Sequence, residues 1–374
     1  MHLLNLPELV SIGPKDQIVP GAYYADDVTA AQLIVLAGGG KMEPLDGINP
    51  LTPDNKSVLF SRMGGFGDLI LLLPVLRELK RQRPDIKIGV STLGHYSVAI
   101  QNIPYIDEVV QYPIPVAVAA KYDAWVWYEN AIERNPEAET VHATDLFAKI
   151  AGIEWGVDAD KCPDYKIKPS EAIWCAEGYP RVPGLRRACI QIGTSAMCRT
   201  YPRNQMGAVA AELVKRNFEV FLMGAKGEIK TPEKMPPTVR NLSDMDLTFR
   251  QSCAVLATAD VVIGSDSALV HVAGALGVPA VGLYGPFPWK LRTAYAPTTH
   301  ALSGVGACAP CFHHASPAKR NHFPDNCPSK AKGICDVLAD IKPERIVATA
   351  EKIAKALPAG ETASPFTVIN GGKE

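Results

Sequence analysis

The order of hydrophobic and polar positions along the chain predicts two successive α/β halves. From residue 57 onward, short apolar runs that favour β-strands alternate with segments whose apolar positions recur at helical spacing. The strand-like runs lie at 57–60, 86–90, 108–112 and 124–127, and then at 188–192, 219–223, 260–263 and 280–284. The chain between the runs leaves room for crossover helices, which parallel strands require. We therefore expect an α/β protein with two parallel sheets.

Helical patterns follow several of these runs. Leucines between residues 69 and 79 recur every three or four positions, and similar patterns cover 206–216 and 268–276. Pro74 interrupts the first pattern. Because proline cannot donate a helical hydrogen bond, we expect either a kink at Pro74 or a helix that begins near it.

A Pro- and charge-rich stretch around residues 161–187 separates the two halves and is the predicted linker. The expected organisation is an N-terminal extension at 1–55, a Rossmann-like domain at 56–180, a second one at 186–357 with a cysteine-rich insertion at 304–336, and a flexible tail at 358–374. Parallel-sheet domains bind ligands beyond the carboxyl ends of their strands. We expect two such domains to face each other across a ligand-binding cleft.

Composition and charge argue against some classes of protein, namely nucleic-acid-binding and membrane-spanning proteins. The 374 residues carry a formal net charge of -1, and lysines and arginines are scattered among carboxylates without a basic stripe. Nucleic acid is therefore not an expected partner. The N-terminus shows no export signal, and the longest apolar run, 69–76, is far shorter than the roughly 20 residues that cross a bilayer. We expect a cytoplasmic protein without a transmembrane segment, whose nine cysteines form no disulfides.

The turn after the first strand is the first candidate site. Gly64, Gly65 and Gly67 allow the backbone to approach a ligand closely, and Asp68 stands where a helix should begin. The plain alternative is that Asp68 is the N-cap of that helix. The glycine spacing does not match the dinucleotide fingerprint, so hydride transfer is not indicated.

A second candidate site opens the predicted helix at 268–276. It follows an apolar strand, and it comprises Asp266, Ser267, Ala268 and Leu269. Exposed backbone N–H groups and the positive end of a helix dipole suit a diphosphate there. The alternative is an ordinary capped helix. His271, one turn further on, is a candidate site residue, although a histidine at such a position is more often part of the core.

A third candidate site follows the first strand of the second half. Thr194, Ser195 and Arg199 supply two hydroxyl groups and a fixed cation, which are anion-binding groups. A surface loop that merely contains one arginine is the alternative.

Four cysteines form a fourth cluster in a Pro- and Gly-rich segment. They are Cys308, Cys311, Cys327 and Cys335. Four thiolates suit tetrahedral zinc or iron, and a loop too polar to fold alone would gain order from such a structural metal. Substitute ligands would be His313, His314 and His322. The alternative is that some of these cysteines are unpaired thiols.

Taken together, the candidate sites resemble glycosyltransferase family 9, the ADP-heptose-using heptosyltransferases of lipopolysaccharide synthesis. The resemblance covers residues 58–350 and rests most on the glycine turn before Asp68 and on 265–273 followed by Gly277-Val278-Pro279 and Tyr284-Gly285-Pro286. It implies a GT-B type fold, with the acceptor on 56–180 and the nucleotide-sugar donor on 186–357. The cysteine segment is similar to a four-cysteine finger in relatives that attach heptose to autotransporter proteins.

The resemblance also implies roles for individual residues. Asp68 matches the general base, and Gly64, Gly65 and Gly67 form an acceptor-side turn. The residues that match the binding site for the donor phosphates are Thr194, Ser195, Arg199, Asp266, Ser267, Ala268 and Leu269. Met245 matches a residue beside the nucleotide base, and Glu228 lies near the ribose. This chain departs from the pattern by inserting Phe66 between the glycines and by placing arginine where lysine is common.

The implied reaction is an inverting sugar transfer. Cations and backbone donors would stabilise the diphosphate leaving group without a divalent metal, and Asp68 would activate an acceptor hydroxyl from the opposite face. The implied acceptors are a glycan such as lipopolysaccharide, a lipid-linked sugar or a protein. Two alternatives remain: a sugar-nucleotide epimerase or hydrolase on the same fold, and a non-catalytic nucleotide-sugar-binding protein.

Overall fold

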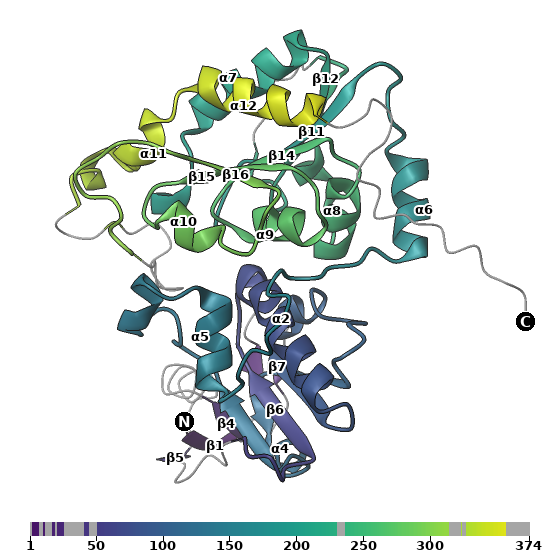
Figure 1. The fold of residues 1–374 in the computed structure, drawn as a ribbon, viewed down its shortest axis with the longest axis vertical. Helices are drawn as coiled ribbons and strands as arrows, with labels where there is room; N and C mark the ends of the chain where they lie inside the picture. Colours follow the sequence, from purple (N-terminus) through teal and green to yellow (C-terminus); the bar gives the residue numbers. More distant parts are fainter. Residues whose placement is uncertain are drawn as a thin grey trace, which may run out of the picture. The chain divides into compact units, whose positions relative to one another are not determined.

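The protein is described by a computed structural model (Figure 1). The structure describes strands at 2–6, 10–11, 17–18, 21–25 and 41–44, and then residues 51–229, 236–313, 323 and 327–356. The predicted tail at 358–374, part of the predicted insertion, His314 and His322 lie outside these described residues. The chain divides into two compact units, Met1–Lys161 (unit 1) and Cys162–Glu374 (unit 2).

Unit 1 contains a parallel sheet in which all four predicted strand runs are confirmed. Its strand order is β10-β6-β7-β8. The strands are β6 (Ser57–Ser61), β7 (Lys87–Thr92), β8 (Glu108–Gln111) and β10 (Ala124–Trp127). All five residues of β6 are buried, as expected for a central strand that has only apolar or small side chains.

The helices of unit 1 pack beside this sheet. They are α2 (Phe66–Gln82), α3 (Gly94–Ser97), α4 (Val116–Ala119), η1 (Pro136–Glu139) and α5 (Ala143–Ile150). Helix α2 packs against α5 and contributes eight buried apolar side chains and Pro74 to the core. Of the two alternatives expected at Pro74, a helix that begins near it is wrong, because α2 begins at Phe66 and continues through Pro74 to Gln82.

A second, antiparallel sheet in unit 1 was not predicted. Its order is β5-β1-β4-β9, formed by β5 (Lys41–Pro44), β1 (His2–Leu6), β4 (Gly21–Ala25) and β9 (Ile114–Pro115). Strands β2 (Val10–Ser11) and β3 (Gln17–Ile18) pair with each other. Because β4 pairs with β9, the N-terminal strands are joined by backbone hydrogen bonds to the segment that follows β8.

Unit 2 contains a six-stranded sheet in which every neighbouring pair is parallel. Its order is β13-β12-β11-β14-β15-β16, and the strands are β11 (Arg186–Gln191), β12 (Phe218–Met223), β13 (Val239–Asn241), β14 (Val261–Ser265), β15 (Ala280–Tyr284) and β16 (Thr299–Ser303). The order reverses between β11 and β14. Such a topological switch point is where α/β sheets bind ligands, at the carboxyl ends of the strands.

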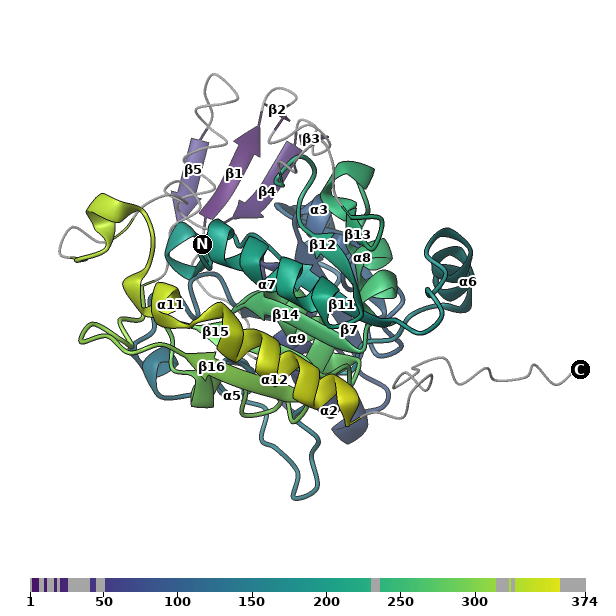
Figure 2. The same ribbon diagram turned by 90° about the horizontal axis from the view of Figure 1, so that it is seen from above.

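Helices cover both faces of this sheet. Helices α7 (Arg203–Lys215) and α12 (Pro343–Lys355) lie together over one face, as Figures 1 and 2 show. Helices α8 (Phe249–Leu256) and α9 (Ala268–Ala275) lie on the other. The remaining helices are α6 (Pro169–Gly178), η2 (Met197–Arg199), η3 (Leu242–Met245), α10 (Trp289–Arg292), η5 (Lys330–Lys332) and α11 (Asp336–Asp340).

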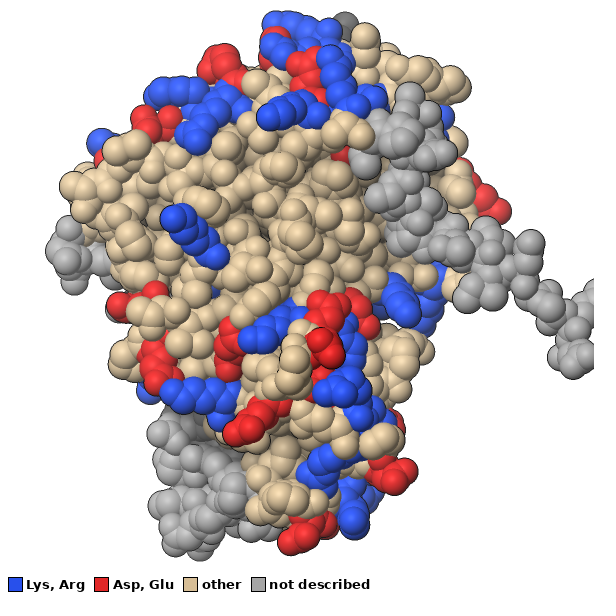
Figure 3. All heavy atoms as spheres, in the orientation of Figure 1, with Lys and Arg blue, Asp and Glu red and all other residues tan. Residues whose placement is uncertain are grey.

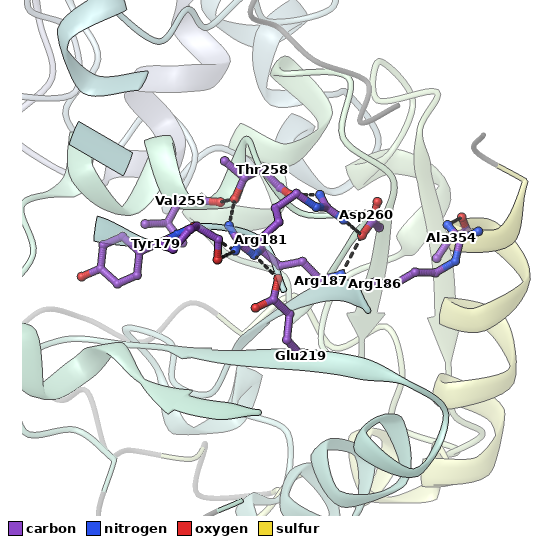
Figure 4. Close-up of polar contacts among 10 residues, drawn as sticks. Tyr179, Arg181, Arg186, Arg187, Glu219, Val255, Thr258, Asp260 and Ala354 are labelled. Carbon is purple, nitrogen blue, oxygen red and sulfur yellow. Dashed lines mark hydrogen bonds and ion pairs between the residues drawn. The ribbon is translucent and has the colours of Figure 1, made fainter. Parts of the chain in front are cut away.

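A buried polar network joins the amino ends of β11, β12 and β14 (Figure 4). Arg187 has no exposed surface and donates from Nε to the Glu219 carboxylate at 2.9 Å and from Nη1 to the Thr258 hydroxyl at 2.6 Å. Asp260 accepts from the backbone N–H of Arg187 at 2.6 Å and pairs with Arg181. Because the network lies at the opposite end of the strands from the switch point, we interpret it as structural.

The surface charges are mixed. On the face shown in Figure 3, basic and acidic side chains are interspersed over unit 1, and a broad area of unit 2 carries few of either. None of the helices in the described part of the chain combines the length and hydrophobicity that crossing a bilayer requires.

Candidate functional site

The switch point of the unit 1 sheet lies between β6 and β10, and a charged cluster forms there. Arg62, which follows β6, is 4% exposed. It donates from Nη2 to Asp68 at 2.7 Å and to Glu133 at 2.6 Å, and from Nη1 to the carbonyl oxygen of Tyr128 at 3.0 Å. Burial alone would lower the pKa of Arg62, but the Asp68 and Glu133 carboxylates raise it well above its usual value. Arg62 is therefore a permanent cation.

Asp68 does not cap the helix. The N-cap of α2 is Gly65, which has a φ of 95° and makes no side-chain cap hydrogen bond, and Asp68 lies within the first turn. The capping interpretation of Asp68 is thus wrong for this fold. Instead, Asp68 Oδ2 pairs with Arg62, and the side chain is 28% exposed. Asp68 Oδ1 has no hydrogen bond among the described residues, so it can accept a proton from a ligand hydroxyl.

Close packing requires glycine at positions 64 and 65 of the turn. A β-carbon at position 64 would lie 2.6 Å from the Tyr96 ring, and one at Gly65 would overlap the Asp68 carboxylate. Phe66, the inserted residue, begins α2 and packs edge-on against Tyr96 with ring centroids 4.7 Å apart. Larger residues at the two glycines would displace Asp68 or Tyr96.

The switch point of the unit 2 sheet brings two of the predicted donor segments together. Arg199, in the loop after β11, donates from Nη2 to the Ser195 hydroxyl at 2.8 Å and from Nη1 to the backbone carbonyl of Asp266 at 3.4 Å. Ser267 donates its hydroxyl to the side chain of Gln191, at the end of β11. The loop after β11 and the turn after β14 therefore form one polar surface.

Internal hydrogen bonds shape the loop after β11. The Thr194 hydroxyl donates to the carbonyl oxygen of Ala196 at 2.6 Å and lies 3.0 Å from the Thr200 hydroxyl. At the start of α9, Ser267 is the N-cap but forms no side-chain cap hydrogen bond. Ala268 and Leu269 are the first two residues of α9, so the positive end of its dipole lies beside this loop.

The Asp266 carboxylate is the most perturbed acid of this surface. It is 4% exposed, with Arg292 Nε 3.4 Å from Oδ2 and His271 Nε2 3.5 Å from Oδ1. Burial raises the pKa of Asp266, but the positive charge of Arg292 and the contact with His271 outweigh burial and hold the pKa well below its usual range. Asp266 is therefore an ionised carboxylate beside the start of α9, and His271 contacts it.

Glu228 and Met245 lie on the two neighbouring loops, after β12 and β13. The Glu228 carboxylate accepts from the backbone N–H of Ala225 at 2.9 Å, and it packs so tightly against Gly193 that any side chain at 193 would overlap it. Met245 ends η3 and is 58% exposed. The Gly227 N–H donates to the Ser243 carbonyl at 3.1 Å, which links the two loops.

Sequence reasoning missed the charged partners of the predicted residues. Arg62 lies shortly after the predicted strand 57–60 and Glu133 in the segment after 124–127, so the rule that sites lie beyond parallel strand ends could have identified them. No sequence signal points to Arg292, because it reaches Asp266 from the separate helix α10.

The four cysteines of the predicted metal site line one small cavity of about 20 Å³, together with Cys198. None forms a disulfide. Among the described residues, however, no group of three or more His, Cys, Asp or Glu side chains is arranged to hold a metal ion. The structure thus gathers the thiols but does not arrange them as a ligand set. Burial raises the pKa of Cys198 to about 11, so it is a neutral thiol at neutral pH.

Comparisons with known proteins place the chain among sugar transferases. The family model of glycosyltransferase family 9 (heptosyltransferase) matches residues 119–322. Lipopolysaccharide heptosyltransferase 1 of Pseudomonas aeruginosa is 23% identical over 188 residues, which are 50% of this chain and 48% of that protein. The chain thus spans about half the length of this curated relative.

Solved structures share the fold. The ADP-heptose lipopolysaccharide heptosyltransferase II of E. coli has a TM-score of 0.57 and 14% identity, covering 80% of this chain and 99% of that one. A family 9 glycosyltransferase of Veillonella parvula has a TM-score of 0.61 and 16% identity, covering 83% and 100%. TibC of enterotoxigenic E. coli, an iron-containing dodecameric glycosyltransferase, has a TM-score of 0.60 and 14% identity, covering 96% and 92%. These similarities show an α/β fold of the GT-B type.

Proposed function

The chain belongs to glycosyltransferase family 9, and we propose that it transfers a heptose from ADP-heptose to an acceptor hydroxyl with inversion at the sugar carbon. A neighbouring structure, that of TibC, was determined with ADP-D-beta-D-heptose. The observation that carries the proposal is that the polar residues of each unit gather at the switch point of its sheet. This is the location at which α/β folds bind ligands.

The donor diphosphate binds at the unit 2 switch point. Arg199, the Ser195 hydroxyl and the first N–H groups of α9 supply a cation and hydrogen-bond donors within one surface. Such groups stabilise the charge that develops on a diphosphate leaving group, and no divalent metal is needed for that step. Glu228 and Met245, on the adjacent loops, hold the ribose and the base.

Asp68 is the general base for the acceptor hydroxyl. Its hydrogen bond to Arg62 fixes the position of Oδ2, while Oδ1 is left to accept the proton. The pairing of Arg62 with both Asp68 and Glu133 holds the carboxylate in one orientation. A positioned base at the attacking hydroxyl contributes typically 10²–10⁴-fold to the rate.

The first test is donor binding. Thermal unfolding is followed with saturating ADP, UDP, GDP and CDP, since a ligand at 100 times its Kd stabilises by about 2.7 kcal/mol. We expect a shift with ADP that is lost in Arg199→Met and kept in Lys215→Met, which removes an exposed lysine of α7. If no nucleotide shifts the wild-type protein, the donor-site assignment is wrong.

The second test is turnover of ADP-heptose, with lipopolysaccharide core and candidate proteins as acceptors. Asp68→Asn should retain ADP binding and lose turnover at least about 100-fold, whereas Asp85→Asn, the same change at an exposed position, should be unaffected. Heptose released to water or epimerised in the wild type, with no acceptor modified, would favour the hydrolase or epimerase. ADP binding without any turnover would favour the non-catalytic binding protein.

We also propose that the cysteine cavity takes a structural zinc or iron ion, after a rearrangement of side chains that brings Cys308, Cys311, Cys327 and Cys335 into ligand positions. The spacing of these cysteines and their shared cavity support the proposal. Elemental analysis of the purified protein should find about one zinc or iron per chain, and Cys308→Ser should lower that content. A metal-free, folded wild-type protein would contradict it.

A further inference from the structure

Arg292 is a semi-buried cation beside the proposed phosphate site, and no predicted role accounts for it. Its side chain is 14% exposed, its guanidinium group lies 4.2 Å from the centroid of the Phe287 ring, and its Nε is 3.4 Å from Asp266 Oδ2. Nε of Arg292 and Oδ2 of Asp266 are both buried, and neither forms a hydrogen bond among the described residues. The two groups therefore interact as charges.

Asp266 presents an electrostatic difficulty for phosphate binding. Its carboxylate is ionised and nearly inaccessible to water, and it precedes the N-terminus of α9. An uncompensated negative charge there would repel a diphosphate, and the low local dielectric would strengthen the repulsion. A nearby positive charge is needed to cancel it.

The other basic groups of the surface contribute less to this compensation than Arg292 does. Arg199 donates to the Asp266 backbone carbonyl and to the Ser195 hydroxyl, and its charge favours the ionised Asp266 carboxylate less than that of Arg292 does. His271 reaches the other carboxylate oxygen, Oδ1, at 3.5 Å. Arg292 is the permanent cation next to Oδ2, and its positive charge is the largest influence that favours the ionised form of Asp266.

We propose that Arg292 is a positioning residue that acts through Asp266. By neutralising this buried carboxylate and holding it beside the start of α9, Arg292 keeps the surface around Arg199 attractive to the diphosphate of a nucleotide. This inference rests on the proposed donor site. A positioning role differs from a direct phosphate contact, because the effect of Arg292 on ADP affinity then depends on the charge of Asp266.

The test measures the affinities of ADP and of adenosine by calorimetry. Arg292→Met should weaken ADP binding by at least about tenfold and leave adenosine, which has no phosphate, within about twofold. Lys290→Met, which removes an exposed charge from the same helix α10, should change neither affinity. An altered fold of the site would weaken both ligands alike, and that result would overturn the inference.

A double substitution separates the two roles of Arg292. If Arg292 acts through Asp266, then Arg292→Met in an Asp266→Asn background should cost less than about threefold in ADP affinity, because no carboxylate is left to compensate. If Arg292→Met weakens ADP binding by the full tenfold in the Asp266→Asn background as well, Arg292 is a direct phosphate ligand and the inference is wrong.

Two other variants test the same role of Arg292 if Arg292→Met is unstable. Should Arg292→Met fail to fold, the double variant, which lacks the unpaired carboxylate, and Arg292→Lys, which keeps the charge, should fold and bind ADP. Failure of both to bind ADP would overturn the inference. If the wild type binds none of the four nucleotides, the donor site itself is wrong, which is distinguishable because wild-type binding is measured first.

Discussion

Removing Arg187 should destabilise unit 2 strongly. This arginine has no exposed surface and donates to the Glu219 carboxylate, the Thr258 hydroxyl and, from Nη2, the carbonyl oxygens of Tyr179 and Pro180 at 2.9 and 3.1 Å (Figure 4). Arg187→Met leaves the Glu219 carboxylate, itself 1% exposed, as a buried charge without its cation. Breaking a buried pair from one side costs about 3–5 kcal/mol.

This cost predicts a measurable change in unfolding temperature. For a folding unit of 150–250 residues, each kcal/mol corresponds to about 2–4 °C, so Arg187→Met should lower the unfolding temperature of unit 2 by about 6–20 °C. Circular dichroism during heating and in urea measures the change. Arg216→Met is the matched control, because it removes an arginine from an exposed ion pair with Glu351 and should cost no more than about 1 kcal/mol.

A second substitution tests the reason for the loss. Arg187→Met combined with Glu219→Leu removes both charges, and replacing a whole buried pair by apolar residues is often neutral or stabilising. The double variant should therefore recover most of the lost stability. A stability of Arg187→Met within about 1 kcal/mol of the wild type would refute the buried-pair explanation. A double variant no more stable than the single one would refute it as well.

Three further predictions follow from other sites. Arg62→Met should reduce turnover at least about tenfold while leaving ADP affinity unchanged, because it releases Asp68 but touches no donor residue; kcat and Kd measured together decide this. A hydrogen bond from Arg81 holds the pKa of Glu78 at about 2, below its ordinary value of 4.5. Ionised Glu78 therefore stabilises unit 1 above about pH 4.5, and this contribution is lost as the pH falls toward 2. In Glu78→Gln, the free energy of unfolding, measured in urea at several pH values, should fall less steeply over this range. Chelation at neutral pH should lower the unfolding temperature if the cysteine cavity holds a metal, with Cys308→Ser insensitive to the chelator.

Local patterns were sufficient to predict most of the parallel strands. The runs 124–127 and 280–284 match β10 and β15, and the others deviate by one or two residues, because buried parallel strands are recognisable as short, continuously apolar segments. The strands β13 and β16 were missed. Each has partly exposed residues, so its apolar signal is weak.

The candidate residues on single loops could also be predicted from sequence. Glycines before Asp68, and hydroxyl groups followed by Arg199, are local patterns whose chemistry does not depend on distant residues. Their positions at strand ends followed from the predicted alternation of strands and helices.

The partners of these residues were decided only by the tertiary structure. Glu133 reaches Arg62 across 71 positions of sequence, and Arg292 reaches Asp266 from another helix, because sheet order determines which strand ends are neighbours. The local pattern of apolar residues does not predict strand order, because it indicates that a strand is buried but not which strand lies next to it. The same reason explains why the sequence grouped four cysteines by spacing, while folding added Cys198 to their cavity. Sequence thus determined the elements and their candidate chemistry, and packing of distant segments determined which charges meet.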